Sequence, residues 1–373
     1  MLEFPHTMHD NPESSAYTVT LVSDTHYDEA PWDRYRPDSP ADPGSLAWRN
    51  FERNIKMWEA LVPRLLSAAA ERSEHSDFVM HLGDVAQGDA ADAATLTRML
   101  EKGYQRVTAA FGEKPVYLLV GNHDVRAPGG VEAYDAWSRR PRNRCFRHGS
   151  DAWILVDTDR PPTLEGLRDL FQQTEGARWT FFLSHRPVFP CNASSVWSFL
   201  YDRHEQTDCR RELRRLLAER KAIVLAAHVH GLYQSVFDFP EGRVTQFVIN
   251  SLWEKPELSE LAFREVSPRK WCTKTSGIAE SERTNFVALA DEYRPYLVSH
   301  RQVHAAGHFR LLVNDDRVML EIFGGDSHQP GDETVLAARD DQNSACCTKA
   351  RILRKIADFL RFGLTSPRNT TSR

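Results

Sequence analysis

The stretch that decides the fold is AYTVTLVSDTHYDEA, residues 16–30, where a nearly continuous apolar run ends in polar side chains. The run from Val19 to Val22 predicts a β-strand that is covered on both faces. Ser23-Asp24-Thr25-His26 follow it directly. Successive side chains of an extended backbone point to opposite faces, so Asp24 and His26 lie on the same side. The strand therefore delivers two potential metal ligands at its carboxyl end.

The composition sets limits on the function. The chain has 373 residues, of which 41% are hydrophobic and 27% charged, which is enough apolar material for one large domain or two smaller ones. A net charge of −5 gives no overall attraction to nucleic acid, so we expect no nucleic-acid partner. No apolar run reaches 18 residues, and the first residues have no signal-peptide pattern. Six cysteines without a CxxC pair are typical of a reducing compartment, and we expect a cytoplasmic location.

Short β-rich runs alternate with amphipathic helices along the chain, which predicts an α/β layered fold. We predict strands at residues 17–22, 78–82, 116–120, 153–156, 180–184, 222–226 and 244–251, and a hairpin of 309–313 with 317–323. Helices are predicted at residues 48–65, 96–110, 163–173 and 208–220. Pro63 lies awkwardly inside the first helix, and Thr163 is the expected N-cap of the third.

The second half of the chain is less regular. We expect one main domain, residues 1–325, with an insertion or cap at about residues 255–305. Residues 326–373 form a predicted C-terminal extension, in which residues 345–362 make a basic amphipathic helix and the rest a polar tail.

Potential metal ligands follow five of the predicted strands. In open α/β sheets, ligands bind beyond the carboxyl ends of the strands, so these side chains are expected to meet in one pocket. The set comprises seven residues: Asp24, His26, Asp84, Asn122, His185, His228 and His230. If the Asp84 carboxylate bridges, seven ligands give four to each of two ions. Nitrogen and oxygen donors without a thiolate suit Mn²⁺, Fe or Zn²⁺, and Mn²⁺ is our first candidate.

These residues form the ordered motifs DTH, GD, GNHD, SH and HVH between Asp24 and His230, and the set resembles the calcineurin-like metallophosphoesterases. The resemblance implies a four-layer α/β fold, a two-sheet β-sandwich flanked by helices. It also implies that a hydroxide bridging two divalent metal ions hydrolyses a small phosphate ester. In that pattern one ion is held by Asp24, His26 and His230, the other by Asn122, His185 and His228, and Asp84 bridges them. His123 stands over the phosphate as a catalytic residue, and Asp124 orients His123.

Two departures from the family pattern help to indicate which branch of the family this chain resembles. Ala227 stands where a glycine is usual before the last motif. Gln87 stands three residues after Asp84, where purple acid phosphatases have a metal-bound tyrosine. The second departure favours a pair of divalent ions, and the D-x-H and N-H-D variants are closer to a phosphodiesterase-type branch. We therefore expect a phosphodiesterase rather than a phosphomonoesterase, and Arg186 is a candidate for binding a phosphate oxygen.

Each motif also has a simpler interpretation. Gly83-Asp84 alone is an ordinary turn, and His185 alone could be a core histidine. Arg186 could be a surface residue. A fold can also carry no chemistry, so a non-catalytic binding scaffold is the alternative function. The loop at residues 28–44 either lines a substrate cleft or is a surface excursion. His300, His304 and His308 have the spacing of a helix face, which is more often solvated than metal-binding.

Overall fold

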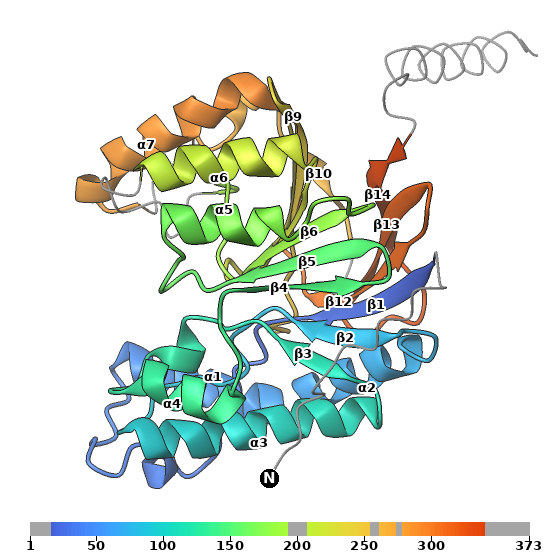
Figure 1. The fold of residues 1–373 in the computed structure, drawn as a ribbon. Coiled ribbons are helices and arrows are strands. Elements are labelled where there is room, and N and C mark those ends of the chain that lie inside the picture. Colours follow the sequence, from blue (N-terminus) through green and yellow to red (C-terminus); the bar gives the residue numbers. More distant parts are fainter. Residues whose placement is uncertain (1–15, 193–206, 254–260, 274–277, 340–373) are drawn as a thin grey trace, which may run out of the picture.

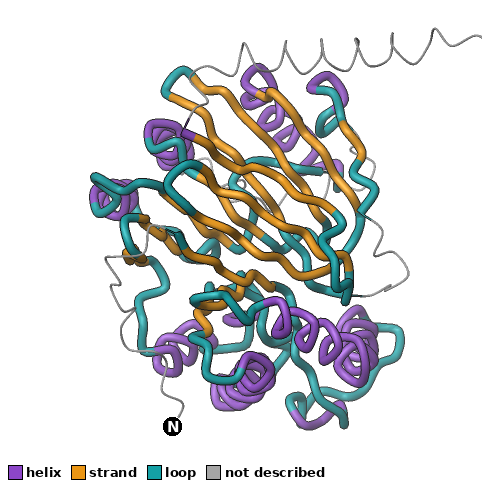
Figure 2. The backbone as a smooth tube through the Cα atoms, turned by 90° about the vertical axis from the view of Figure 1, so that its right-hand side faces the viewer, coloured by secondary structure: helices purple, strands orange, loops and turns teal. Residues whose placement is uncertain are grey.

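The computed structural model describes residues 16–192, 207–253, 261–273 and 278–339. Two mixed β-sheets pack face to face, and helices cover the outer face of each sheet (Figure 1). This four-layer arrangement confirms the fold predicted from the motifs. Figure 2, turned by 90° about the vertical axis, shows the strands side by side with helices along and below them.

The first sheet has the strand order β14-β13-β12-β1-β2-β3. Its central strands are parallel, β1 with β2 and β2 with β3, whereas β12, β13 and β14 are antiparallel additions. The bounds are β1 Tyr17–Val22, β2 Phe78–His81, β3 Val116–Leu118, β12 Gly307–Val313, β13 Arg317–Gly324 and β14 Asp332–Ala338. The three predicted parallel strands and the predicted hairpin are therefore confirmed, with shifts of one or two residues at some ends.

The second sheet has the strand order β10-β11-β8-β9-β7-β6-β5-β4. Strands β5, β6, β7 and β9 are parallel neighbours, and the apolar runs of the first three are typical of parallel strands. The bounds are β4 Arg144–His148, β5 Asp151–Val156, β6 Thr180–Ser184, β7 Ile223–Ala226, β8 Leu232–Phe239, β9 Gly242–Val248, β10 Arg264–Glu265 and β11 Leu297–Val303. Strands β4, β8, β10 and β11 were not predicted. The five residues RCFRH of β4 are all only partly buried, so their pattern has no apolar run.

Helices α1–α4 cover the first sheet and α5–α7 cover the second (Figure 1). Their bounds are α1 Leu46–Lys56, α2 Val62–Arg72, α3 Ala93–Phe111, α4 Gly130–Ser138, α5 Leu164–Gln172, α6 Thr207–Glu219 and α7 Glu280–Tyr293. Thr163 caps α5 as predicted, because its side chain accepts a hydrogen bond from the Gly166 N–H. Among the helices of the described residues, none is long and apolar enough to cross a membrane.

Pro63 explains why the predicted helix at residues 48–65 is divided. A proline has no N–H and clashes with the carbonyl group four residues earlier. The chain accommodates Pro63 with a π-helical turn, Met57–Leu61, that separates α1 from α2 and places the proline in the first turn of α2.

The described residues of the segment 255–305 belong to the helix layer and the second sheet. It supplies α7 to the outer helix layer, and β11 pairs with β8 inside the second sheet. In the predicted C-terminal extension, β14 pairs with β13 and lengthens the first sheet. The predicted helix at residues 345–362 lies outside the described residues.

The sheets are held together by a core of aliphatic and aromatic side chains from both inner faces. Leu21 and Phe309 of the first sheet and Leu183, Leu225 and Phe247 of the second are completely buried in it. At roughly 1.5–3 kcal/mol for each fully buried large side chain, this core holds the strand ends in fixed positions.

The prediction that His300, His304 and His308 lie on one solvated helix face was wrong, because two of these histidines are buried in strands. His300 lies in β11 and His308 in β12, whereas His304 is exposed between them. Burial lowers the pKa of His300 to about 4, and its Nδ1 lies 2.8 Å from Ser235 Oγ. The native state therefore keeps this ring neutral.

We expect His300 to make the fold sensitive to acid. Its folded pKa lies below the unfolded value, so the unfolded chain takes up the proton first and stability falls as the pH drops from about 6.5 towards 4. Between pH 7 and pH 5 this one residue should cost about 2 kcal/mol. The measurement is denaturant unfolding at both pH values for the wild type and His300→Gln, and the variant should lose less stability. Exposed His304→Gln is the control, and equal losses in all three proteins would rule the effect out.

Candidate metal centre

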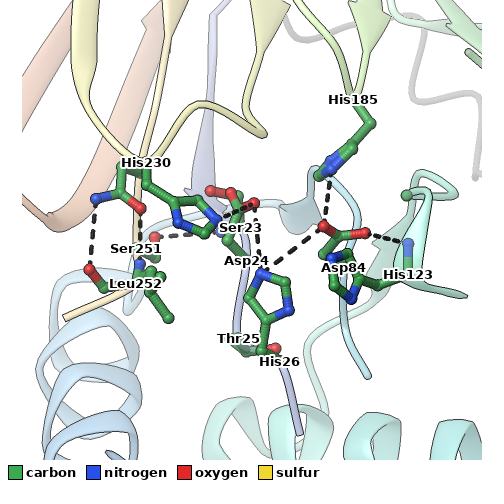
Figure 3. A network of polar contacts seen from close by, with 12 residues as sticks. Ser23, Asp24, Thr25, His26, Asp84, His123, His185, His230, Ser251 and Leu252 are labelled. Carbon is green, nitrogen blue, oxygen red and sulfur yellow. Dashed lines mark hydrogen bonds and ion pairs between the residues drawn. The ribbon is translucent and has the colours of Figure 1, made fainter. Parts of the chain in front are cut away.

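Predicted ligands that follow β1, β2, β6 and β7 come together at the carboxyl ends of these strands, and Figure 3 shows Asp24, His26, Asp84, His185 and His230 pointing toward one another. Three overlapping groups have potential ligand atoms within 4.8 Å of one another. The groups are Asp24 with His26 and His230, Asp84 with His185 and His228, and His26 with Asp84 and His123. The first group is the ligand set predicted for one ion. The second group contains Asp84 with His185 and His228, two of the three ligands predicted for the other ion; Asn122, the third, is not in these groups of His and Asp side chains.

The loops after β1 and β2 run beside each other and fix the first ligands. The Asp24 N–H donates to the Gly83 carbonyl group and the His26 N–H to the Asp84 carbonyl group, both at 3.0 Å. The loop after β9 joins them, because the Ser23 N–H donates to Ser251 Oγ at 3.2 Å. The ligands are therefore attached to one hydrogen-bonded backbone framework.

The backbone at the ligands adopts an unusual conformation. Positive φ angles occur at Asp24 (50°), His26 (44°), Asp84 (57°), His228 (74°) and His230 (47°). This left-handed region costs of order 1–3 kcal/mol for a residue with a side chain. Such strain persists only where the surrounding structure imposes it, and it concentrates at functional sites.

Two glycines of the motifs leave room for Asp84 and His185. A Cβ atom on Gly121 would lie 2.2 Å from Asp84 Oδ1, and a Cβ atom on Gly83 would lie 2.6 Å from His185 Nδ1. Gly83 also has a φ of +96°, which side chains disfavour. These contacts explain why the GD and GNHD motifs begin with glycine.

Asp84 lies at the centre of the group and is 1% exposed. Its Oδ1 accepts a hydrogen bond from the His123 N–H at 2.8 Å, and its Oδ2 lies 3.0 Å from His185 Nε2 and 3.7 Å from His26 Nε2. Asp24 Oδ1 lies 3.6 Å from His230 Nε2 and 4.0 Å from His26 Nε2. Several of these separations are too long for hydrogen bonds but suit side chains that share a cation.

Buried ligand atoms without partners indicate that the residues fit a metal ion. Among the described residues, both carboxylate oxygens of Asp24, both ring nitrogens of His26 and Oδ1 of Asn122 are buried without a hydrogen-bond partner. Unsatisfied buried polar atoms are rare in folded proteins and call for an explanation. Divalent cations bound by these nitrogen and oxygen atoms would satisfy them.

The protonation states also suit metal binding. Burial lowers the pKa of His26 and His228 well below the usual value, so both rings are neutral and offer a lone pair. Burial alone would raise the pKa of Asp84, but His185 and its other neighbours lower it, so the carboxylate is ionised. His185 is the exception: burial would lower its pKa, but the charge of Asp84 raises it to about 10, so this ring would have to lose a proton before it could bind a metal ion.

His123 is oriented by a backbone carbonyl group and not by Asp124. Nδ1 of His123 lies 2.7 Å from the Gln87 carbonyl oxygen, which only accepts, so this contact places the ring proton on Nδ1. The Asp124 carboxylate instead accepts hydrogen bonds from the N–H groups of Asp84, Ala86 and Gly121. Asp124 therefore holds together the loops after β2 and β3, and its effect on His123 is indirect.

Two arginines lie next to the histidines. Arg186, the predicted phosphate-binding residue, forms an ion pair with Asp159 at 2.9 Å and is 23% exposed. Sequence reasoning missed Arg126, whose Nη1 lies 2.8 Å from Nδ1 of His123. Its position two residues after the GNHD motif was the available signal.

The loop at residues 28–44 is anchored close to the ligands. Arg36 and Asp28 form a buried two-pronged ion pair at 2.8 and 3.2 Å, and the guanidinium group lies 4.5 Å from the Trp32 ring centroid. Trp32 and Tyr35 are also buried, so their side chains pack inside the protein. Residues 37–44 are exposed.

Comparison with known proteins agrees with the geometry. The family model for calcineurin-like phosphoesterases matches residues 17–232, more than half of the chain, whereas no curated protein matches significantly. One similar structure is the purple acid phosphatase PPD1 from yellow lupin (Lupinus luteus) seeds, with 14% identity, a TM-score of 0.50, and coverage of 87% of this chain and 54% of that chain.

The structure of PhoD has 13% identity and a TM-score of 0.49, covering 87% of this chain and 69% of that chain. A dimetal phosphatase from Danio rerio has 12% identity and a TM-score of 0.46, covering 86% and 99%. Likeness at such identities shows the fold alone. The family model, which spans all five motifs up to His230, shows that the chain belongs to the calcineurin-like phosphoesterases, a family of metal-dependent phosphoester hydrolases.

Proposed function

We propose that this chain hydrolyses a phosphodiester with two divalent metal ions, Mn²⁺ being the first candidate and Fe or Zn²⁺ the others. The observation that carries the proposal is the set of three ligand groups linked through His26 and Asp84, with buried ligand atoms that lack protein partners. Two bound ions would activate a water molecule for attack on phosphorus and neutralise the charge that develops there.

The side chains have separate roles in this proposal. Asp24, His26 and His230 hold one ion, Asn122, His185 and His228 hold the other, and the ionised Asp84 serves both. His123 has a ring nitrogen within 4.8 Å of a ring nitrogen of His26 and a carboxylate oxygen of Asp84, and it assists departure of the leaving oxygen. Arg186 remains a candidate for a phosphate oxygen.

The environment of Gln87 supports a divalent pair. Its side chain is completely buried, accepts a hydrogen bond from Asn54 Nδ2 at 2.7 Å and donates one to Asp89 at 2.8 Å. A neutral amide held by these hydrogen bonds cannot supply the anionic oxygen that a metal-bound tyrosine gives to a trivalent iron ion. The preference for diesters rests on the motif resemblance alone.

The test compares p-nitrophenyl phosphate with bis-p-nitrophenyl phosphate in the presence of Mn²⁺, Fe²⁺ or Zn²⁺. We expect metal-dependent turnover, faster with the diester. Faster turnover of the monoester would reverse the preference. Stoichiometric metal binding without turnover of either ester would favour the non-catalytic scaffold.

Removing a ligand should remove metal and activity together. We expect about two metal ions in each wild-type chain and fewer than one in Asp84→Asn, because both ions lose a ligand. His228→Ala should lose one ion. Turnover should fall by more than the roughly 10–100-fold typical of changes to residues behind the ligands. Elemental analysis with parallel rate measurements checks this, with exposed His75→Ala as the control. Full metal content in Asp84→Asn would contradict the shared role.

Gly121→Ala should damage the metal centre without unfolding the protein. The added methyl group would lie 2.2 Å from Asp84 Oδ1 and push that carboxylate away from the ligands. We expect reduced metal content with an unchanged circular-dichroism spectrum. The control is Gly166→Ala, where the nearest atom to the new methyl group is a side-chain carbon at 3.3 Å. Normal metal content in Gly121→Ala would contradict this prediction, because it would show that the loop after β3 can move to accommodate the methyl group.

His123→Ala should separate chemistry from metal binding. Because His123 is not among the seven ligands, the variant should keep both ions while its kcat falls by roughly 10²–10⁴-fold. Elemental analysis and steady-state kinetics on the same preparation check this. A variant that keeps its rate would remove His123 from the reaction.

A further inference from the structure

Arg126 lies beside His123, the residue proposed to assist departure of the leaving group. Its Nη1 lies 2.8 Å from Nδ1 and 3.3 Å from Nε2 of His123, so the guanidinium group packs against the ring. The side chain is 41% exposed, so a ligand can reach it from solvent. His123 in turn belongs to the group formed with His26 and Asp84. A cation is therefore placed beside the residue that, in the proposed function, assists departure of the leaving oxygen.

A hydrogen-bonded chain holds Arg126 in this place. Asn54 donates to the Gln87 side chain, Gln87 donates to Asp89, and Asp89 Oδ1 lies 3.3 Å from Arg126 Nε. Asp89 contacts the guanidinium group at Nε, whereas Nη1 faces His123. Gln87 also binds His123 through its carbonyl oxygen, so one residue positions both the histidine and the arginine.

The backbone conformation at Gly88 allows the loops that carry His123 and Arg126 to pack closely. Gly88 has a φ of +70°, and a Cβ atom there would lie 1.7 Å from the His123 carbonyl oxygen and 3.1 Å from Arg126 Cγ. Only glycine permits the loops after β2 and β3 to pack this closely. The arginine is therefore built into the site by two loops and is not a side chain that merely extends over the surface.

We propose that Arg126 binds a phosphate group on the leaving group, and that the substrates are diphosphate diesters, in which the leaving group is itself a phosphate monoester. A guanidinium group matches phosphate oxygens with paired donors, whereas it gains little from an uncharged alcohol. In the reaction a water oxygen bonds to one phosphorus and the bond from that phosphorus to the bridging oxygen breaks. The departing phosphate monoester keeps the electron pair, and one proton of the water passes to solvent. This inference rests on the proposed function.

The test uses two substrates with the same nucleoside. P¹,P²-dithymidine diphosphate has a phosphate leaving group, and the p-nitrophenyl ester of thymidine 5′-monophosphate does not. In Mn²⁺-loaded protein, Arg126→Gln should lower kcat/KM for the diphosphate by about 10–100-fold and for the nitrophenyl ester by less than about threefold. Arg126→Lys should fall between. Exposed Arg98→Gln, on α3, is the control and should change neither.

Binding gives an independent readout. Calorimetry with α,β-methylene thymidine diphosphate, whose P–C–P bridge is not hydrolysed, should show at least about tenfold weaker binding to Arg126→Gln than to the wild type. Binding of thymidine monophosphate should change by less than about threefold. Equal losses for both ligands and both substrates would mean that Arg126 acts only by positioning His123, and would overturn the inference while leaving the proposed function intact. If the wild type hydrolyses neither substrate with any of the metals, the proposed function fails and the inference with it.

Discussion

The structure depends on one buried carboxylate, Asp84. It is 1% exposed, lies against His185 and His26, and accepts a backbone hydrogen bond from His123. An isolated charge at such depth would be very costly, so its neighbours must compensate it. Glycines at positions 83 and 121 and the backbone hydrogen bonds of Asp124 all serve to keep that carboxylate in place. The ligand groups on either side are arranged around it.

The two sheets supply the rigidity that this arrangement requires. Five ligands have left-handed backbone conformations, which together cost several kcal/mol by the usual estimate for such residues. The strands that precede them are anchored in a core where side chains such as Leu183 and Leu225 are completely buried. The burial of apolar surface between the sheets therefore offsets the strain at their edge. The regular, well-packed sandwich allows the residues at its edge to keep strained backbone conformations.

The parts that could be predicted from the sequence share a physical cause. Asp24, His185 and His228 were found because parallel strands end at one edge of a sheet, and residues at such ends must converge. The roles of Asp124 and Gln87 were not predictable, because a carboxylate that binds backbone N–H groups and a carbonyl group that binds a ring leave no periodic pattern. The burial of His300 was missed because β11 is a strand whose polar pattern resembles an exposed segment. The hairpin of β12 and β13, by contrast, could be predicted because the polar residues Asn314-Asp315-Asp316 separate two apolar runs.

The Asp28–Arg36 ion pair has a consequence for the divergence of such chains. It closes the base of a surface loop only two residues after His26, and beyond it residues 37–44 are all exposed. A buried ion pair therefore separates changes at that exposed tip from the proposed metal ligands. We expect variation in the length or sequence of the tip to disturb the metal centre less than variation between His26 and the ion pair.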